Sequence, residues 1–230
     1  MTSRRVTTLA VKSHARAGAG PAAAETLERL RASAEAFGRE RPGALTAPPN
    51  ISSDETMTLS LASPGHALPA MLALADAARP SKTTFGLSIA PAGPGGTPAD
   101  PASIASAPGP LAAARARECL EETDPRSGRV VIAGRERRLA VSTLCDLVLE
   151  AYDAMTPRQR QIVELAKHSP TQQDVATHLD VSRQAVNQSL AAAGFFHLRA
   201  AEQVIARRLA ALGGEAAEPL PAERDREARP

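Results

Sequence analysis

The stretch that most constrains the fold is residues 171–193, TQQDVATHLDVSRQAVNQSLAAA. Apolar residues recur there at helical intervals on either side of a short break, which predicts two short helices joined by a tight turn. Thr171 and Ser182 are the expected N-caps, because their hydroxyl oxygens can accept from backbone N–H groups of the first turn. Asp180, in the turn, is expected at positive φ, which Asp tolerates better than most residues. The residues expected to close the two helices together are Val175, Ala176, Leu179, Val181, Val186 and Leu190.

The second of these helices has two chemically different faces. An inward stripe at i, i+3, i+4 and i+7 is formed by Val186, Ser189, Leu190 and Ala193. The opposite face carries one guanidinium, three carboxamides and no acid, which suits the donor and acceptor edges of bases in a major groove. The alternative is that this face is merely solvated. Its residues are Arg183, Gln184, Asn187, Gln188 and Ala191.

Composition limits what the chain can be. With 230 residues and 43% hydrophobic side chains, the chain can form one large or two small cores. Only 2% of the residues are aromatic, so these cores must be built mainly from Ala, Leu and Val. No run of about 18 apolar residues exists to span a bilayer, so no membrane partner is expected. The net charge of +2 is too small to indicate nucleic-acid binding. Residues 156–212 nevertheless hold more basic than acidic side chains.

The cysteines and histidines indicate no metal chemistry. Cys119 and Cys145 are far apart, lie in expected helices and show no ligand spacing, so we expect buried thiols in a reducing cytosol. The five histidines form no cluster in the sequence. We therefore predict a cytoplasmic protein with no metal and no cofactor.

The first half of the chain alternates expected strands and helices. Strands are predicted at residues 6–11, 57–61 and 85–89, helices at 21–40 and 64–78, and a hairpin turn at 50–55. Strand, helix, two hairpin strands, helix, strand is the order of a ferredoxin-like split βαβ fold, with helices on one face of an antiparallel sheet. The predicted class is therefore α+β.

The rest of the chain is expected to be helical apart from one hairpin. Residues 91–110 predict a loop, 111–121 a helix, 129–132 and 139–142 a hairpin around GRER, and 143–155 a helix. Thr156 and Gln159 form a capping box that starts a new helix. Gly194 should end the second short helix, Phe195 and Phe196 should anchor a long amphipathic one, and its apolar stripe is available to a second copy. The expected domains are 1–155 and 156–212, followed by a disordered tail at 213–230.

Three resemblances follow from these residues. MTPRQRQIVELA and TQQDVATHLDVSRQAVNQSL resemble the helix-turn-helix of sigma-factor region 4 and related bacterial regulators. A strand-rich half followed by SPTQQDVATHLDVSRQAVNQSLAAAGFF resembles the SatD-type bacterial proteins. The N-terminal half is distantly similar to class III nucleotidyl cyclase domains through Ser53-Asp54-Glu55, Gly109-Pro110-Leu111, AAARARECLEE and RVVIAG.

The cyclase resemblance implies a chemical test that the sequence does not pass. Two-metal phosphoryl transfer needs carboxylates at the end of the first strand and on the central hairpin. Asp54 and Glu55 stand at the hairpin, but Lys12 stands where the first acid is required. The sequence also contains no P-loop, nucleophile elbow or GxGxxG after a strand. We therefore expect no enzyme activity.

The preferred hypothesis is a sequence-specific DNA-binding regulator that acts as a homodimer on an inverted repeat. One alternative is a nucleotide-binding or degenerate cyclase-like protein with a helix-turn-helix output. Another is an adaptor that binds a partner such as RNA polymerase through the last helix. The residues predicted to contact double-stranded DNA are Arg158, Arg160, Thr171, Gln172, Gln173, Ser182, Arg183, Gln184, Asn187 and Gln188.

Overall fold

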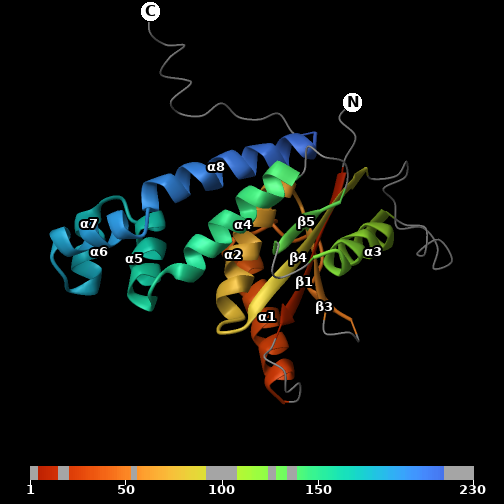
Figure 1. Cartoon of the computed structure of the whole chain (residues 1–230), viewed down its shortest axis with the longest axis horizontal. Helices are drawn as coiled ribbons and strands as arrows, with labels where there is room; N and C mark the ends of the chain where they lie inside the picture. The colour runs from red at the N-terminus through yellow and green to blue at the C-terminus, as the bar shows by residue number, and fades with distance from the viewer. Residues whose placement is uncertain are drawn as a thin grey trace, which may run out of the picture.

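A five-stranded sheet lies at the centre of the N-terminal half (Figure 1). The computed structural model describes residues 5–14, 21–52, 56–91, 108–123, 128–133 and 139–214. The strand order is β2-β3-β1-β4-β5, the first four strands are antiparallel to their neighbours, and β5 runs parallel to β4. The strands are β1 (Arg5–His14), β2 (Asn50–Ile51), β3 (Thr56–Leu61), β4 (Lys82–Pro91) and β5 (Val130–Ile132).

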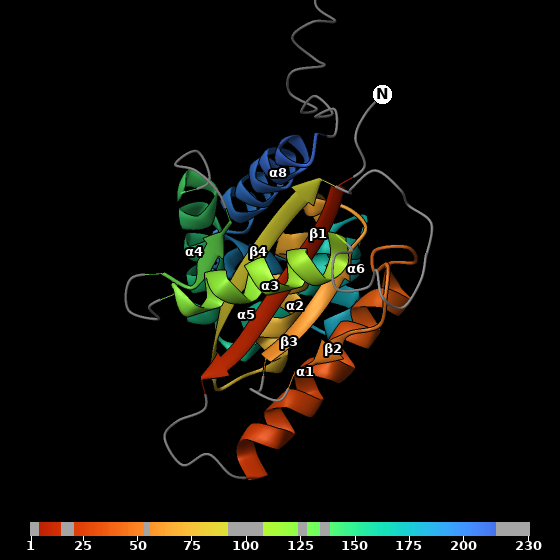
Figure 2. The same cartoon turned by 90° about the vertical axis from the view of Figure 1, so that its right-hand side faces the viewer.

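Helices cover both faces of this sheet, which corrects the prediction of helices on one face only. The helices α1 (Pro21–Glu40) and α2 (Ala67–Ala77) pack on the face that carries Leu9 and Val11, and α3 (Pro108–Glu121) crosses the other face (Figure 2). That second face is lined by small side chains such as Ala10. A Cβ at Gly86 would overlap the carbonyl oxygen of Ala116, so glycine at this position permits the close approach of α3.

The predicted hairpin at 129–132 and 139–142 is wrong in its second strand. Leu139 begins α4 (Leu139–Ala154), and Val141, Cys145 and Leu149 are buried on one side of that helix. The segment 139–142, Leu-Ala-Val-Ser, is too short to distinguish a strand from a helix, and the helical spacing of the residues that follow decides it. The first strand exists as β5, but it pairs in parallel with β4. The GRER segment lies outside the described residues.

Two further boundaries differ from the prediction. Asn50 and Ile51, expected in the hairpin turn, form β2 and pair with β3, while residues 53–55 lie outside the described part of the chain. The helix expected from residue 111 begins three residues earlier, at Pro108. The loop was expected at residues 91–110; Pro91 belongs to β4, and residues 92–107 lie outside the described ranges.

The C-terminal helix α8 (Phe195–Leu212) returns from the far end of the molecule to the N-terminal half (Figure 1). Its stripe of Leu198, Ile205 and Leu209 is buried, and the helix packs on α4, on α2 and on the 3-10 turn η1 (Pro64–His66). That burial corrects the expectation that the stripe is available to a second copy. One continuous core therefore runs through both halves of the chain.

The two phenylalanines at the start of α8 behave differently, although both were expected to be anchors. Phe195 packs against the core, whereas Phe196 is 61% exposed and touches Phe195 edge-to-face, with ring centroids 5.4 Å apart. None of the helices in the described ranges is long and apolar enough to span a membrane. Both cysteines are buried, as expected, and burial raises the pKa of the Cys145 thiol to about 12, with Asp146 adding to the effect.

A buried guanidinium ties α4 to the sheet. The side chain of Arg129 is 5% exposed and donates to the Thr83 carbonyl oxygen at 2.8 Å and to its Oγ1 at 3.0 Å. It also donates to Oδ2 of Asp153 on α4 at 2.5 Å, and Arg79 donates to the other oxygen of that carboxylate at 2.8 Å. The backbone N–H of Arg129 donates to Asp146, a second acid of α4, at 2.8 Å. Arg129, which directly precedes β5, thereby links that strand to β4 and to α4.

Replacing Gly86 with alanine is expected to destabilise the fold, because the added methyl group must displace α3 from the sheet. We expect a loss of about 1–3 kcal/mol in the free energy of unfolding, measured by urea denaturation. Gly65→Ala is the control, since a Cβ there meets Ser63 Oγ at an ordinary 3.5 Å. Equal stability of the two variants would contradict this account of α3.

Replacing Asp153 with alanine is expected to lower the free energy of unfolding by about 3 kcal/mol, because it leaves the buried Arg129 without its counter-charge. Asp76→Ala is the matched control: its carboxylate also contacts Arg79, at 3.1 Å, but is 66% exposed, so we expect a loss of at most about 1 kcal/mol. Thermal and urea unfolding monitored by circular dichroism would measure both. Similar losses from the two variants would refute the role given to Asp153.

Candidate nucleic-acid interface

Three short helices form the end of the molecule farthest from the sheet (Figure 1). They are α5 (Pro157–His168), α6 (Gln172–Leu179) and α7 (Arg183–Ala192). The expected capping box starts α5: Thr156 Oγ1 accepts from the Gln159 N–H at 3.2 Å, and Gln159 Oε1 accepts from the Thr156 N–H at 2.8 Å. The pyrrolidine of Pro157 occupies the first helical position, where no N–H is required.

The turn between α6 and α7 has the predicted geometry. Asp180 lies in the left-handed region, at φ 51° and ψ 51°, and is the one described non-glycine residue with positive φ. Thr171 Oγ1 accepts from the Asp174 N–H at 3.2 Å, and Asp174 accepts from the Thr171 N–H at 3.0 Å. Ser182 Oγ accepts from the Ala185 N–H at 3.1 Å. Both caps are therefore confirmed.

The residues expected to close α6 against α7 form a small aliphatic core. Val175, Ala176, Val186 and Leu190 are buried, while Leu179 and Val181 are partly buried. Ile162 and Val163 of α5 are buried in the same cluster. Because the side chains of this core are short, α6 and α7 lie close together. Packing on α5, α6 and α8 fixes the orientation of α7.

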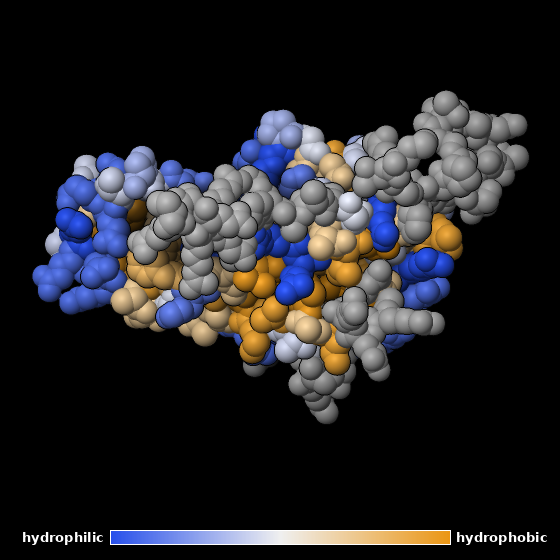
Figure 3. All heavy atoms as spheres, turned by 90° about the horizontal axis from the view of Figure 1, so that it is seen from above, coloured by the Kyte–Doolittle hydropathy of each residue, from blue (hydrophilic) through white to orange (hydrophobic). Residues whose placement is uncertain are grey.

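The predicted reading face of α7 is open. The side chains of Arg183, Gln184, Asn187 and Gln188 are all exposed, and among the described residues none of them makes a hydrogen bond or ion pair. Figure 3 shows hydrophilic side chains gathered at this end of the molecule. The hydrogen-bonding groups of the face are thus available to an external partner such as base edges.

The residues around α6 that are predicted to contact DNA are less available to an external partner than those of α7. Gln173 is exposed and Gln172 half-buried. The Thr171 hydroxyl donates to Asp174 at 2.7 Å while accepting from its backbone, so it is engaged within the cap. Ser182 Oγ is likewise occupied as an acceptor. Both hydroxyls therefore hold the helix ends, and the side chains of α7 remain as the open donors and acceptors.

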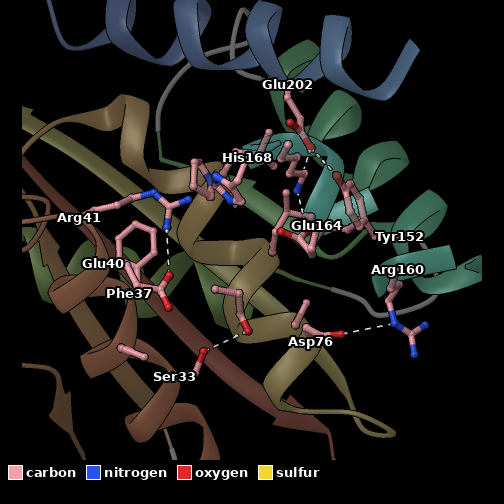
Figure 4. A pocket seen from close by; sticks show the side chains of 18 of the residues that line it. Ser33, Phe37, Glu40, Arg41, Asp76, Tyr152, Arg160, Glu164, His168 and Glu202 are labelled. Atoms are coloured by element: carbon pink, nitrogen blue, oxygen red, sulfur yellow. Dashed lines mark hydrogen bonds and ion pairs between the residues drawn. The ribbon is translucent and has the colours of Figure 1, made fainter. Parts of the chain in front are cut away.

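The two arginines of α5 point to different neighbours. Arg158 is exposed and reaches the α6–α7 turn, with its Nη2 3.4 Å from the Leu179 carbonyl oxygen. Arg160 turns to the N-terminal half: its Nη1 donates to the Met155 carbonyl oxygen at 2.5 Å, and its Nε lies 3.6 Å from Asp76 of α2 (Figure 4). Only Arg158 lies beside the reading face in this arrangement.

A polar cluster that sequence reasoning missed holds α8 behind this unit. Tyr152 of α4 donates to Glu202 of α8 at 2.7 Å, and Lys167 of α5 lies over the Tyr152 ring, 4.7 Å from its centroid. Burial raises the pKa of Tyr152 above its ordinary value, and the adjacent Glu202 raises it further, so the hydroxyl stays a donor. These residues are far apart in sequence, and no local pattern indicates their contact.

The family described as Sigma-70, region 4, matches residues 151–193. That segment is similar to a DNA-binding helix-turn-helix. The match begins in the last turn of α4 and ends just after α7, so it contains the caps, the aliphatic core and the open face described above. No curated protein matches the chain significantly. The SatD-type and cyclase-like resemblances of the rest of the chain remain predictions.

The described residues contain no cluster of three or more histidine, cysteine or acidic side chains that could hold a metal ion. Asp54 and Glu55, the acids of the cyclase comparison, lie outside the described ranges. Lys12 is an exposed residue of β1, paired with Thr56 and Thr84 on the neighbouring strands.

Substitution of Asp180 tests the turn. Asp180→Val is expected to lower the free energy of unfolding by about 1–2 kcal/mol, because a β-branched side chain is strained at positive φ. Asp180→Gly, the matched variant, is expected to be as stable as the parent within about 1 kcal/mol. Denaturant titration of both proteins would measure the difference. If the valine variant were as stable as the glycine variant, the turn would not need this backbone conformation.

Proposed function

We propose that this chain is a sequence-specific DNA-binding transcriptional regulator that reads a major groove with α7. The observation that carries the proposal is the open face of α7 within the segment that matches sigma-70 region 4. Three carboxamides and one guanidinium can pair with adenine and guanine edges, and the face carries no carboxylate that would repel phosphates. The residues assigned to the bases are Arg183, Gln184, Asn187 and Gln188.

Phosphate contacts are assigned to the border of this face. Arg158 is exposed beside the α6–α7 turn, and Gln172 and Gln173 lie in the first turn of α6, where backbone N–H groups suit an anion. Arg160 is left out of this set because its guanidinium faces α2. One helix-turn-helix contacts few base pairs, so we propose a homodimer on an inverted repeat, with the N-terminal half serving dimerisation or sensing.

The N-terminal half is proposed to be a ferredoxin-like unit without catalytic activity. The antiparallel order β2-β3-β1-β4 with α1 and α2 on one face supports this assignment, while α3 and β5 are additions to it. Lys12 on β1, at the position where two-metal chemistry needs a carboxylate, supports the absence of cyclase activity. An adaptor that binds RNA polymerase is the alternative favoured by the likeness to a sigma-70 segment. It predicts no stable DNA complex without that partner.

The experiment is selection of bound DNA from a random pool with the full chain, followed by fluorescence anisotropy on the selected site. The full chain is used because an isolated 156–212 fragment would expose the stripe of α8 that α2, α4 and η1 cover. We expect Arg183→Ala combined with Gln184→Ala to reduce the preference for the selected site over scrambled DNA by about 10- to 100-fold, since each good base contact contributes about 1–3 kcal/mol of discrimination.

Arg117→Ala is the control, because Arg117 is an exposed cation of α3 at the opposite end of the molecule. It should leave the preference unchanged. An inverted repeat among the selected sites would support the homodimer. An undiminished preference in the double variant would refute the assignment of these side chains, and binding only in the presence of RNA polymerase would favour the adaptor.

A further inference from the structure

A cavity of about 540 Å³ lies between the N-terminal half and the helix-turn-helix (Figure 4). Its lining comes from α1 and α2 on one side and from α4, α5 and α8 on the other. Pockets that hold small molecules occupy roughly 300–1,000 Å³ and occur preferentially between domains. Size and position therefore both fit a ligand site.

The floor of the cavity is apolar. Pro69, Leu72 and Ala73 of α2 are partly exposed there, with Ala36 of α1 and Ala206 of α8 beside them. Water in contact with these groups is displaced favourably by hydrocarbon, which stabilises a bound apolar body by about 25 cal/mol for each Å² covered. The floor thus favours a ligand with an aliphatic or aromatic portion.

Most cations around the cavity are already compensated. Of the carboxylates that line it, Asp76, Asp153, Glu164 and Glu202 are each paired with a guanidinium or ammonium group, and Glu40 is 72% exposed, so the walls offer no strong site for a cationic ligand. The contacts of the compensated cations are Arg79 with Asp153 at 2.8 Å, Arg160 with the Met155 carbonyl oxygen at 2.5 Å, Lys167 with Glu164 at 2.7 Å and Arg199 with Glu202 at 3.0 Å.

Arg41 is the least compensated of these groups. Its guanidinium lies over the Phe37 ring, 4.9 Å from the centroid, and its carboxylate neighbour Glu40 is 3.9 Å away and 72% exposed. Such an exposed pair at this distance contributes little. His168, at the end of α5, also lines the cavity, and its imidazole makes no hydrogen bond within the described part of the chain. Two different walls of the cavity, the end of α1 and the end of α5, thus each contribute a hydrogen-bond donor that could meet an anionic group.

We propose that this cavity binds a small amphipathic carboxylic acid, with its apolar body on the α2 floor and its carboxylate accepting hydrogen bonds from Arg41, assisted by His168. A planar guanidinium stacked on an aromatic ring is a preorganised partner for a carboxylate. The site goes beyond the proposed DNA binding and does not depend on it.

Occupancy would link the two halves of the chain. A ligand that touches α1 and α2 on one side and α5 and α8 on the other favours the arrangement in which these helices enclose it. Because α5 belongs to the segment that matches sigma-70 region 4, the ligand is placed to influence the position of α7.

The test is isothermal titration of the full chain, without DNA, with benzoate and hexanoate, and with benzyl alcohol and hexanol as their neutral counterparts. We expect at least one acid to bind and its alcohol to bind at least tenfold more weakly. Arg41→Gln should weaken the binding of that acid by about tenfold, because the variant loses a charge-assisted hydrogen bond. Arg39→Gln removes an exposed cation in the last turn of α1, two residues before Arg41; it is the control and should bind like the parent.

A second variant tests the floor. Ala73→Phe fills the cavity and should abolish binding while leaving the circular dichroism spectrum unchanged; if it unfolds the chain, Arg41→Gln alone decides. The proposal is overturned if no acid binds, if the alcohols bind as tightly as the acids, or if Arg41→Gln and Arg39→Gln bind alike. None of these results bears on DNA recognition, which is measured separately.

Discussion

The buried guanidinium of Arg129 is the interaction on which the arrangement of the two halves depends. The guanidinium bonds to β4 through Thr83 and to α4 through Asp153, and the backbone N–H of the same residue donates to Asp146, so the edge of the sheet and α4 are positioned together. A buried cation is costly unless its donors are satisfied, and this one is satisfied only when α4 lies where it does. Because α5 begins three residues after α4 ends, the same cluster sets the starting point of the helix-turn-helix.

Local signals in the sequence were sufficient to predict the helices of the C-terminal unit. Caps, a turn residue and helical spacing are short-range features, and they specify α5, α6, α7 and the open face of α7 because each acts within a few residues. The same kind of signal also located β1, β3, β4, α1 and α2. The family match to residues 151–193 independently supports the helix-turn-helix.

Features that depend on contacts between distant residues were not predictable. The apolar run at 139–142 fits a strand or a helix equally well, and only its burial within α4 decides. Placement of α3 on the second face rests on an approach permitted by Gly86. The direction of Arg160 follows from α2 lying beside α5. The cavity is formed by five helices, α1, α2, α4, α5 and α8, and no single helix carries a sequence pattern that indicates it.

The path of α8 has a mechanical consequence. Its first residues adjoin α7, and its last turn rests at η1, where Gly213 lies against Pro64. Eighteen residues of α-helix form a rod about 27 Å long. A tilt of about 10° at the η1 end would swing the other end by roughly 5 Å, more than the 3.4 Å step between successive bases. Small rearrangements beside the sheet would thus be amplified into a larger displacement at the end of α8 that adjoins α7.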